Sequence, residues 1–118
     1  MPRYLTMVRI DENNTPAEGI SEGLMQRMGA LIEEMTKAGV LLDTAGLMPT
    51  SKGKRVHYEN GQITVTDGPF TETKEVIGGY ALLQTKDEAE CLEWTKRFLQ
   101  VHEPHWTVTS EIREIQEG

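Results

Sequence analysis

The feature that most constrains the fold is an Asn60-Gly61 pair that stands between two stretches of alternating polar and apolar residues. A two-residue hairpin turn needs a positive φ angle at both central positions, and Asn followed by Gly adopts these angles with little strain. The pair therefore predicts an antiparallel hairpin formed by residues 54–59 and 62–67.

The predicted register of this hairpin separates apolar from polar side chains. One face holds Val56, Tyr58, Ile63 and Val65, and the other holds Arg55, His57, Thr64 and Thr66. A slip of one residue in either strand would mix the two faces, so their clean separation supports the register. Lys54 then lies opposite Asp67, where the two side chains can form an ion pair.

The rest of the chain predicts an α+β domain around the hairpin. Strands are expected at residues 3–10, from residue 40, at 77–85 and at 106–115, and helices at 21–38 and 87–101. The order of these elements is that of a ferredoxin-like domain with an inserted hairpin. We therefore expect an antiparallel sheet with both helices on one face.

Local signals mark the helices. Their buried stripes are expected to be Leu24, Met28, Leu31 and Met35, widened by Met25 and Ile32, and then Cys91, Trp94, Phe98 and Val101. Gly39 follows the first stripe, where a helix C-terminus favours glycine. Asp87 and Glu90 form a variant of the capping box. Gly29 inside the first helix hints at close packing there.

The strand at residues 77–85 is apolar on both faces. Tyr80 and Leu82 alternate with Ala81 and Leu83, so this strand should be central in the sheet and covered on both sides. The two helices cover one face only. A second copy of the chain is the simplest cover for the other face, so we expect a two-fold homodimer of face-to-face sheets.

Size and charge narrow the class of protein. A chain of 118 residues fits one domain, residues 1–118. Its only cysteine, Cys91, excludes an intrachain disulfide and favours a reducing compartment. Residues 1–10 lack the apolar core of a signal peptide, and no run of about 18 apolar residues is present. We therefore expect a cytoplasmic protein that does not enter membranes.

The formal net charge of −7 disfavours binding to nucleic acid or to anionic lipid. A local basic patch would be needed for either partner. The best candidate is the group Lys52, Lys54 and Arg55, which is more typical of a solvated strand end. We expect neither a nucleic-acid partner nor a membrane.

The run Asp67-Gly68-Pro69-Phe70 is the strongest pointer to a site. Continued alternation of the hairpin would put the Asp67 carboxylate on the apolar side, where its pKa would rise toward that of a general acid or base. Asp67 is therefore the candidate catalytic residue. The structural alternative is that Asp67 caps the turn by accepting backbone hydrogen bonds, or pairs with Lys54.

Residues after Asp67 are candidates for substrate binding. They are Gly68, Pro69, Phe70, Lys74, Glu75, Gly78 and Gly79. Lys74 would contact a small anionic metabolite and Phe70 would wall the pocket. The Gly78-Gly79 pair would let a ligand or another backbone approach closely. The alternative for Lys74 and Glu75 is ordinary surface charge.

The histidines do not form a recognisable metal motif. His102, Glu103 and His105 follow the second helix without the four-residue spacing of a helical zinc site. Exposed or helix-capping histidines are therefore expected rather than metal ligands. Cys91 lies on a buried stripe and is expected to be an inert thiol. We expect no metal and no cofactor.

Residues 65–82, which include the Asp67–Phe70 run and the Gly78-Gly79 pair, resemble the YCII-related proteins of the DGPF type. Shorter matches extend the likeness over nearly the whole chain. The resemblance implies a dimeric α+β barrel of ferredoxin-like subunits in the bacterial cytoplasm, and some relatives are associated with alternative sigma factors. A His–Asp pair is suspected in the shorter YCII-like branch. Here the predicted register puts His57 and Asp67 on opposite hairpin faces.

Three hypotheses of function follow. The first is a cofactor-independent acid–base enzyme with a cleft beside the residue 67–75 loop. The second is a non-catalytic dimer that senses a ligand or regulates a partner, with a link to alternative sigma factors. The third is a purely structural turn at a dimer interface. An enzyme needs a titratable group that faces an enclosed pocket, which separates it from the other two hypotheses.

Overall fold

The computed structural model describes residues 1–117. Its elements are β1 Arg3–Ile10, α1 Glu22–Lys37, β2 Leu41–Gly46, the 3-10 turn η1 Thr50–Lys52, β3 Lys54–Glu59, β4 Gln62–Asp67, β5 Val76–Gln84, α2 Glu88–Gln100 and β6 Thr109–Glu114. The predicted helices and strands are all present. The largest difference is at β6, which begins three residues later than expected, at Thr109.

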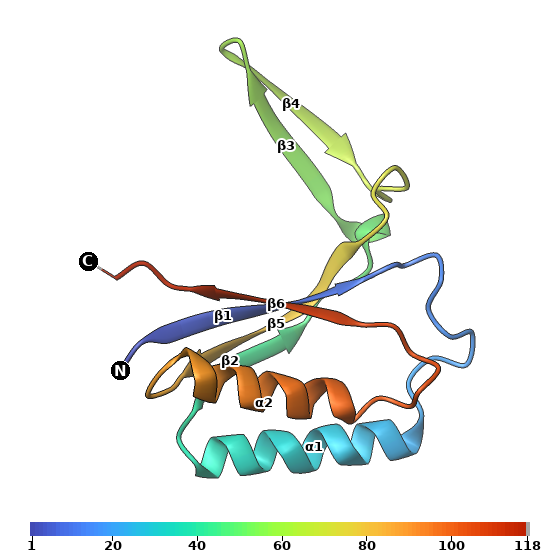
Figure 1. Cartoon of the computed structure of the whole chain (residues 1–118). Helices are drawn as coiled ribbons and strands as arrows, with labels where there is room; N and C mark the ends of the chain where they lie inside the picture. Colours follow the sequence, from blue (N-terminus) through green and yellow to red (C-terminus); the bar gives the residue numbers. More distant parts are fainter. Residues whose placement is uncertain (118) are drawn as a thin grey trace.

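Four strands form one antiparallel sheet in the order β2-β5-β1-β6. Helices α1 and α2 pack against one face of this sheet (Figure 1). This arrangement confirms the predicted ferredoxin-like α+β fold. Strand β5 lies between β2 and β1, so its predicted central position is also confirmed. Within residues 1–117, no helix is both long and apolar enough to cross a bilayer.

The core lies between the sheet and the helices. Its buried members are Tyr4, Leu31, Met35, Val40, Leu83 and Cys91. Met25 is 65% exposed, so the prediction that it widens the helical stripe is wrong. Thr95, by contrast, is buried, and its hydroxyl donates to the Cys91 carbonyl at 2.8 Å. That internal hydrogen bond lets a polar side chain lie in an apolar core.

The predicted helix ends are confirmed in detail. Asp87 accepts a hydrogen bond from the Glu90 backbone N–H at 2.9 Å, and Glu90 in turn accepts from the Lys86 N–H at 2.8 Å. Gly39 has a φ of +76°, as a left-handed helix end requires. The close packing expected at Gly29 is not found, because a Cβ placed there would meet nothing within 4 Å.

Strands β3 and β4 form a separate two-stranded sheet in the predicted register, from Lys54 opposite Asp67 to Glu59 opposite Gln62. The hairpin rises from the body on the side away from the helices, as a projecting arm (Figure 1). Its apolar face is exposed to solvent: Val56 is 68%, Tyr58 72%, Ile63 67% and Val65 60% exposed. We call these four side chains the arm patch.

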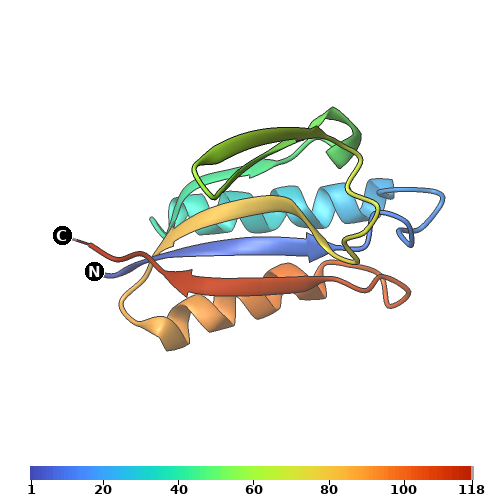
Figure 2. The ribbon, with the colours of Figure 1, turned by 90° about the horizontal axis from the view of Figure 1, so that it is seen from above.

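Within residues 1–117, no helix or strand packs on the sheet face away from the helices. Seen from above, strands β5, β1 and β6 lie uncovered, with the helices beneath them (Figure 2). Directly paired residues share a face, so Leu5 with Leu82 and Met7 with Tyr80 lie at the centre of this open face. The predicted two-sided cover of β5 is thus supplied on one side only within the chain.

Candidate functional site

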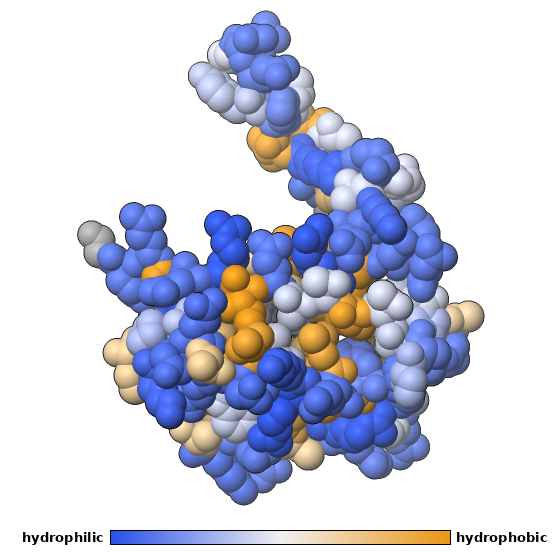
Figure 3. Space-filling view, viewed as in Figure 1, coloured by the Kyte–Doolittle hydropathy of each residue, from blue (hydrophilic) through white to orange (hydrophobic). Residues whose placement is uncertain are grey.

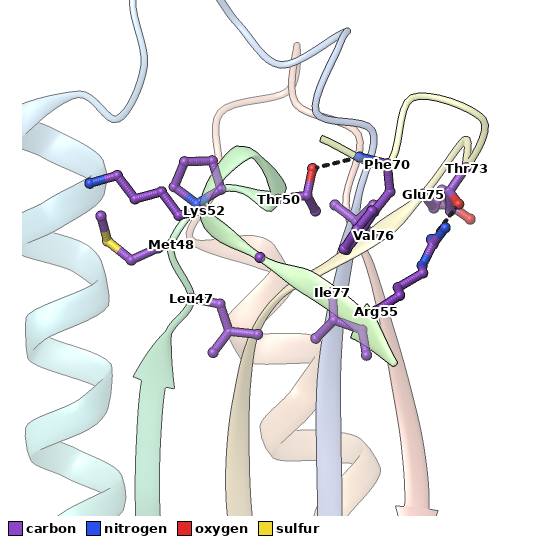
Figure 4. A pocket seen from close by; sticks show the side chains of 12 residues that line it. Leu47, Met48, Thr50, Lys52, Arg55, Phe70, Thr73, Glu75, Val76 and Ile77 are labelled. Carbon is purple, nitrogen blue, oxygen red and sulfur yellow. Dashed lines mark hydrogen bonds between the residues drawn. The ribbon is translucent and has the colours of Figure 1, made fainter. Parts of the chain in front are cut away.

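A cleft of about 390 Å³ lies where the loop after β2, the base of the arm and the segment before β5 meet (Figure 4). Its apolar walls are Leu47, Met48, Pro49, Phe70, Val76 and Ile77, and its polar side chains are Thr50, Lys52, Arg55, Thr73 and Glu75. Apolar walls with a few polar groups, at this volume, are typical of a small-molecule site.

The Asp67-Gly68-Pro69-Phe70 turn borders the cleft because it docks on the η1 loop. The Gly68 N–H donates to the Gly53 carbonyl at 2.9 Å, and the Phe70 N–H donates to the Thr50 hydroxyl at 3.3 Å. No side chain fits at position 68, since a Cβ there would lie 1.7 Å from the Thr50 carbonyl oxygen. The glycine of the turn is therefore fixed by contact between two backbones.

Glu12, in the loop after β1, holds Thr50 from the other side. One carboxylate oxygen accepts from the Thr50 N–H at 2.8 Å and the other accepts from the Thr50 hydroxyl. Three distant segments of the chain thus meet at one threonine. Sequence reasoning missed Glu12 and Thr50, because no local pattern marks a contact between residues 38 positions apart. Glu12 also borders a second cavity of about 230 Å³.

Arg55 links the arm to the loop after the turn. Its guanidinium lies over the Phe70 ring, 4.0 Å from the centroid, and donates to the Thr73 hydroxyl at 2.7 Å. It also forms an ion pair with Glu72. A backbone hydrogen bond, and then Arg55, hold the pKa of Glu72 below its usual value. The base of the arm is therefore braced by stacking, by hydrogen bonding and by charge.

Glu75 is the carboxylate that lines the cleft. It is partly buried, 34% exposed, and pairs with Arg9 at 3.5 Å. Arg9 also pairs with Glu111 at 3.4 Å, across the open face from β1 to β6. The polar end of the cleft is thus continuous with a charged network at the end of the open face.

Asp67 lies outside this cleft. Its side chain is 75% exposed and forms an ion pair with Lys54, which confirms the pairing expected from the register. The apolar hairpin face that it shares with Val65 is exposed to solvent in the single chain rather than buried. The catalytic role of Asp67 therefore stays a prediction, without an enclosing pocket around it in this chain.

The other predicted site residues are divided between the cleft and its surroundings. Phe70 and Glu75 line the cleft, whereas Lys74 is exposed outside it. Gly78 borders the second cavity. At Gly79 the close approach expected from the sequence is present, and the neighbour is strand β2, since a Cβ there would lie 2.9 Å from the Ala45 carbonyl oxygen.

The histidine loop makes structural contacts. The His102 Nδ1 lies 3.1 Å from the Leu99 carbonyl oxygen, and the His105 Nε2 lies 2.8 Å from a Glu18 carboxylate oxygen. Glu103 accepts hydrogen bonds from Ser21 and Arg27 of the α1 N-terminus. These contacts tie the segment after α2 to the start of α1.

The chain is similar to known proteins over most of its length. The model of the YCII-related domain matches residues 3–114. An uncharacterized protein of Rhizobium meliloti (strain 1021) is 30% identical over 95 residues, which cover 79% of this chain and 77% of the relative.

Proposed function

Because this chain belongs to the family of YCII-related domain proteins, whose model matches nearly all of it, and because it forms a cleft of about 390 Å³, we propose that it binds a small anionic metabolite there. The cleft is the observation that supports the proposal. Its volume suits a metabolite, and its walls offer apolar contact on several sides.

The basic side chains at the cleft are the reason for proposing an anionic ligand. Arg55 is already occupied by Glu72 and Thr73. Lys52 makes no ion pair within residues 1–117, and its side chain extends past Met48 at the rim (Figure 4). A flexible lysine can turn its ammonium toward an anionic group at the mouth. The ligand we propose has an apolar body in the cleft and a carboxylate at Lys52.

Two matched probes test this class of ligand. Titration of the ¹⁵N-labelled chain with hexanoate should shift the amide signals of residues 47–53 and 70–77. Hexanol, which lacks the charge, should bind the same residues more weakly. The variant Lys52→Met should weaken hexanoate binding about fivefold to tenfold and leave hexanol binding unchanged, as loss of one ion pair predicts.

Lys74→Met is the control, because Lys74 lies outside the cleft and was the anion contact expected from the sequence. It should leave the affinity for both probes unchanged. Equal effects of the two lysine variants, or the absence of amide shifts around the cleft, would contradict the proposal.

We propose that the protein acts as a homodimer in which each subunit covers the open face of the other. Leu5, Met7, Tyr80 and Leu82 form the apolar centre of this face, which no other element covers within residues 1–117 and which suits a second apolar surface. Light scattering after size exclusion should give twice the chain mass of 13.3 kDa. A mass equal to one chain at micromolar concentration would rule the dimer out.

A catalytic role for the cleft would require Glu75 rather than Asp67 as the acid–base group, because only Glu75 lines it. Incubation of a metabolite extract with the wild type, Glu75→Gln and Asp67→Asn, followed by mass spectrometry, separates an enzyme from a sensing module. Loss of a product with Glu75→Gln alone supports an acid–base enzyme. Ligand binding without any product supports the non-catalytic module.

A further inference from the structure

We propose that the β3–β4 hairpin is an exchanged arm: in the homodimer, its apolar face lies on the open face of the partner subunit. This inference rests on the dimer of the proposed function and adds the element through which the two chains hold each other. It also makes the partner part of the surroundings of the cleft.

The arm patch needs a cover. Val56 pairs with Val65 and Tyr58 with Ile63, so the four side chains form one continuous surface. Each of them is at least 60% exposed. An isolated two-stranded hairpin is marginally stable in water and needs an apolar face packed against something. Within residues 1–117 the two strands of the arm pair only with each other.

The arm is held away from its own sheet. An open hollow separates the hairpin from the body in the space-filling view, and one hydrophobic patch of the hairpin is visible on that side (Figure 3). At its base the arm is anchored by the Gly68–Gly53 and Phe70–Thr50 hydrogen bonds and by the Arg55–Glu72 ion pair. These anchors oppose a swing of the arm back onto the same chain.

The exposed apolar areas of the arm patch and the open face are large enough for an interface with a second copy of the chain. With roughly 150–200 Å² for a whole large side chain, the arm patch exposes on the order of 450 Å². That is about half of the roughly 800 Å² that each partner buries in a standard interface. The open face of the same chain supplies the remaining area. A two-fold rotation places each arm on the other sheet, so each subunit buries both of its apolar surfaces.

The charges of the two surfaces also favour a second copy of the chain as the partner. Two copies with a net charge of −7 each repel one another unless the surfaces that meet are balanced. Residues 54–67 contain two basic and two acidic side chains. On the open face, Arg9 and Arg113 form ion pairs with Glu111, and the Asp43 carboxylate accepts a hydrogen bond from the Tyr80 hydroxyl. Positive and negative side chains are thus nearly balanced on both surfaces, so repulsion between the two surfaces should be small.

The cleft borders this interface. Ile77 lines the cleft and pairs in the sheet with Arg9, at the end of the open face. Ile77 is 49% exposed in the single chain. A partner docked on the open face therefore lies next to the cleft, and we expect dissociation of the dimer to weaken hexanoate binding as well.

Two neighbouring positions of β4 provide a matched test. Ile63 belongs to the arm patch and Thr64 to the opposite, polar face, and both are exposed in the single chain. Ile63→Glu should raise the dimer dissociation constant by roughly 100-fold or more, because it buries an unpaired charge at the interface. Thr64→Glu adds the same charge and should leave the dimer intact. Light scattering over a concentration series measures both.

Crosslinking identifies the surface that the arm touches. Ile63 is replaced by the photo-reactive residue p-benzoylphenylalanine, and ¹⁴N and ¹⁵N chains are mixed so that links between chains can be recognised by mass spectrometry. Links to β1 and β5 of the other chain support the arm exchange. Links to the other chain's hairpin, or within one chain only, overturn it.

The two proposals fail in different ways. A wild type that is monomeric removes the dimer of the proposed function and the arm exchange together. If the wild type is dimeric and Ile63→Glu leaves the dimer dissociation constant unchanged, only the arm exchange is removed. In that case the dimer and the cleft stand without it.

Discussion

Gly68 is the residue on which the shape of the cleft depends most directly. Its backbone touches the Thr50 carbonyl so closely that a Cβ would lie 1.7 Å from that oxygen. We expect Gly68→Ala to lower the free energy of unfolding by at least about 3 kcal/mol, since two backbones must separate. Denaturant unfolding measures the loss.

Gly46→Ala is the control for this substitution. A Cβ at Gly46 would meet nothing within 4 Å, so the change in unfolding free energy should stay within about 0.5 kcal/mol. Similar losses at both positions would mean that general backbone effects, rather than the contact with Thr50, explain the need for glycine in the turn.

Asp67 is expected to matter little for stability. Its carboxylate and the Lys54 ammonium are 75% and 65% exposed, and ion pairs in water contribute little. Asp67→Asn should change the melting temperature by no more than about 2 °C. A larger fall would show that Asp67 is buried in the working assembly, for example by the open face of the partner subunit.

At the scale of single elements, helix α1 contains a glycine that no close packing contact requires. Gly29 lies in the middle of the helix with nothing within 4 Å of a Cβ. Gly29→Ala should raise the free energy of unfolding by about 1 kcal/mol, because alanine loses less backbone entropy in a helix. Thermal melts should show a gain of a few degrees.

Gly39, at the end of the same helix, should respond in the opposite direction. Its φ of +76° is costly for any residue with a Cβ. Gly39→Ala should therefore lower the free energy of unfolding by about 1 kcal/mol. A stabilising effect there would contradict the left-handed helix end.

The contact between the start of α1 and the segment after α2 predicts a pH dependence. Hydrogen bonds from the Ser21 hydroxyl and then from Arg27 hold the pKa of Glu103 below its usual value. The folded protein therefore favours the ionised carboxylate. The stabilisation is present above the ordinary pKa of a glutamate and is lost as the pH falls through the lower pKa of the folded state.

Melting temperatures of the wild type and Glu103→Gln should therefore differ at pH 7 and converge as the pH falls below the lowered pKa of Glu103. Glu33→Gln is the control, because the Glu33–Lys37 pair is exposed on both sides and should give little difference at either pH. A difference for Glu103→Gln that stays constant with pH would contradict the ionic contact.

At the scale of the whole molecule, the arm makes the single chain less compact than its length allows. The Cα radius of gyration is 16.2 Å. A compact domain of this length has a radius of about 13.5 Å. Small-angle scattering of monomeric Ile63→Glu should give a value near the larger figure. A value near the smaller one would show that the arm folds back on its own sheet.

The sequence alone determined the elements and the hairpin register. The Asn60-Gly61 turn fixes the register through backbone angles of two adjacent residues, and the capping box of Asp87 and Glu90 fixes the start of α2 within one turn. These are local interactions, so a local pattern predicts them. The apolar residues on both faces of β5 also predicted its central place in the sheet, because apolar character is visible in the residues themselves.

Only the tertiary structure decided where the cleft is and which side chains line it. The contact of Glu12 with Thr50 joins residues 38 positions apart, and the position of Glu75 in the cleft depends on how the turn docks on that loop. The exposure of Asp67 depends in turn on the arm standing away from the sheet. These contacts and exposures depend on how whole elements pack against one another. The spacing of residues along the chain does not encode that packing.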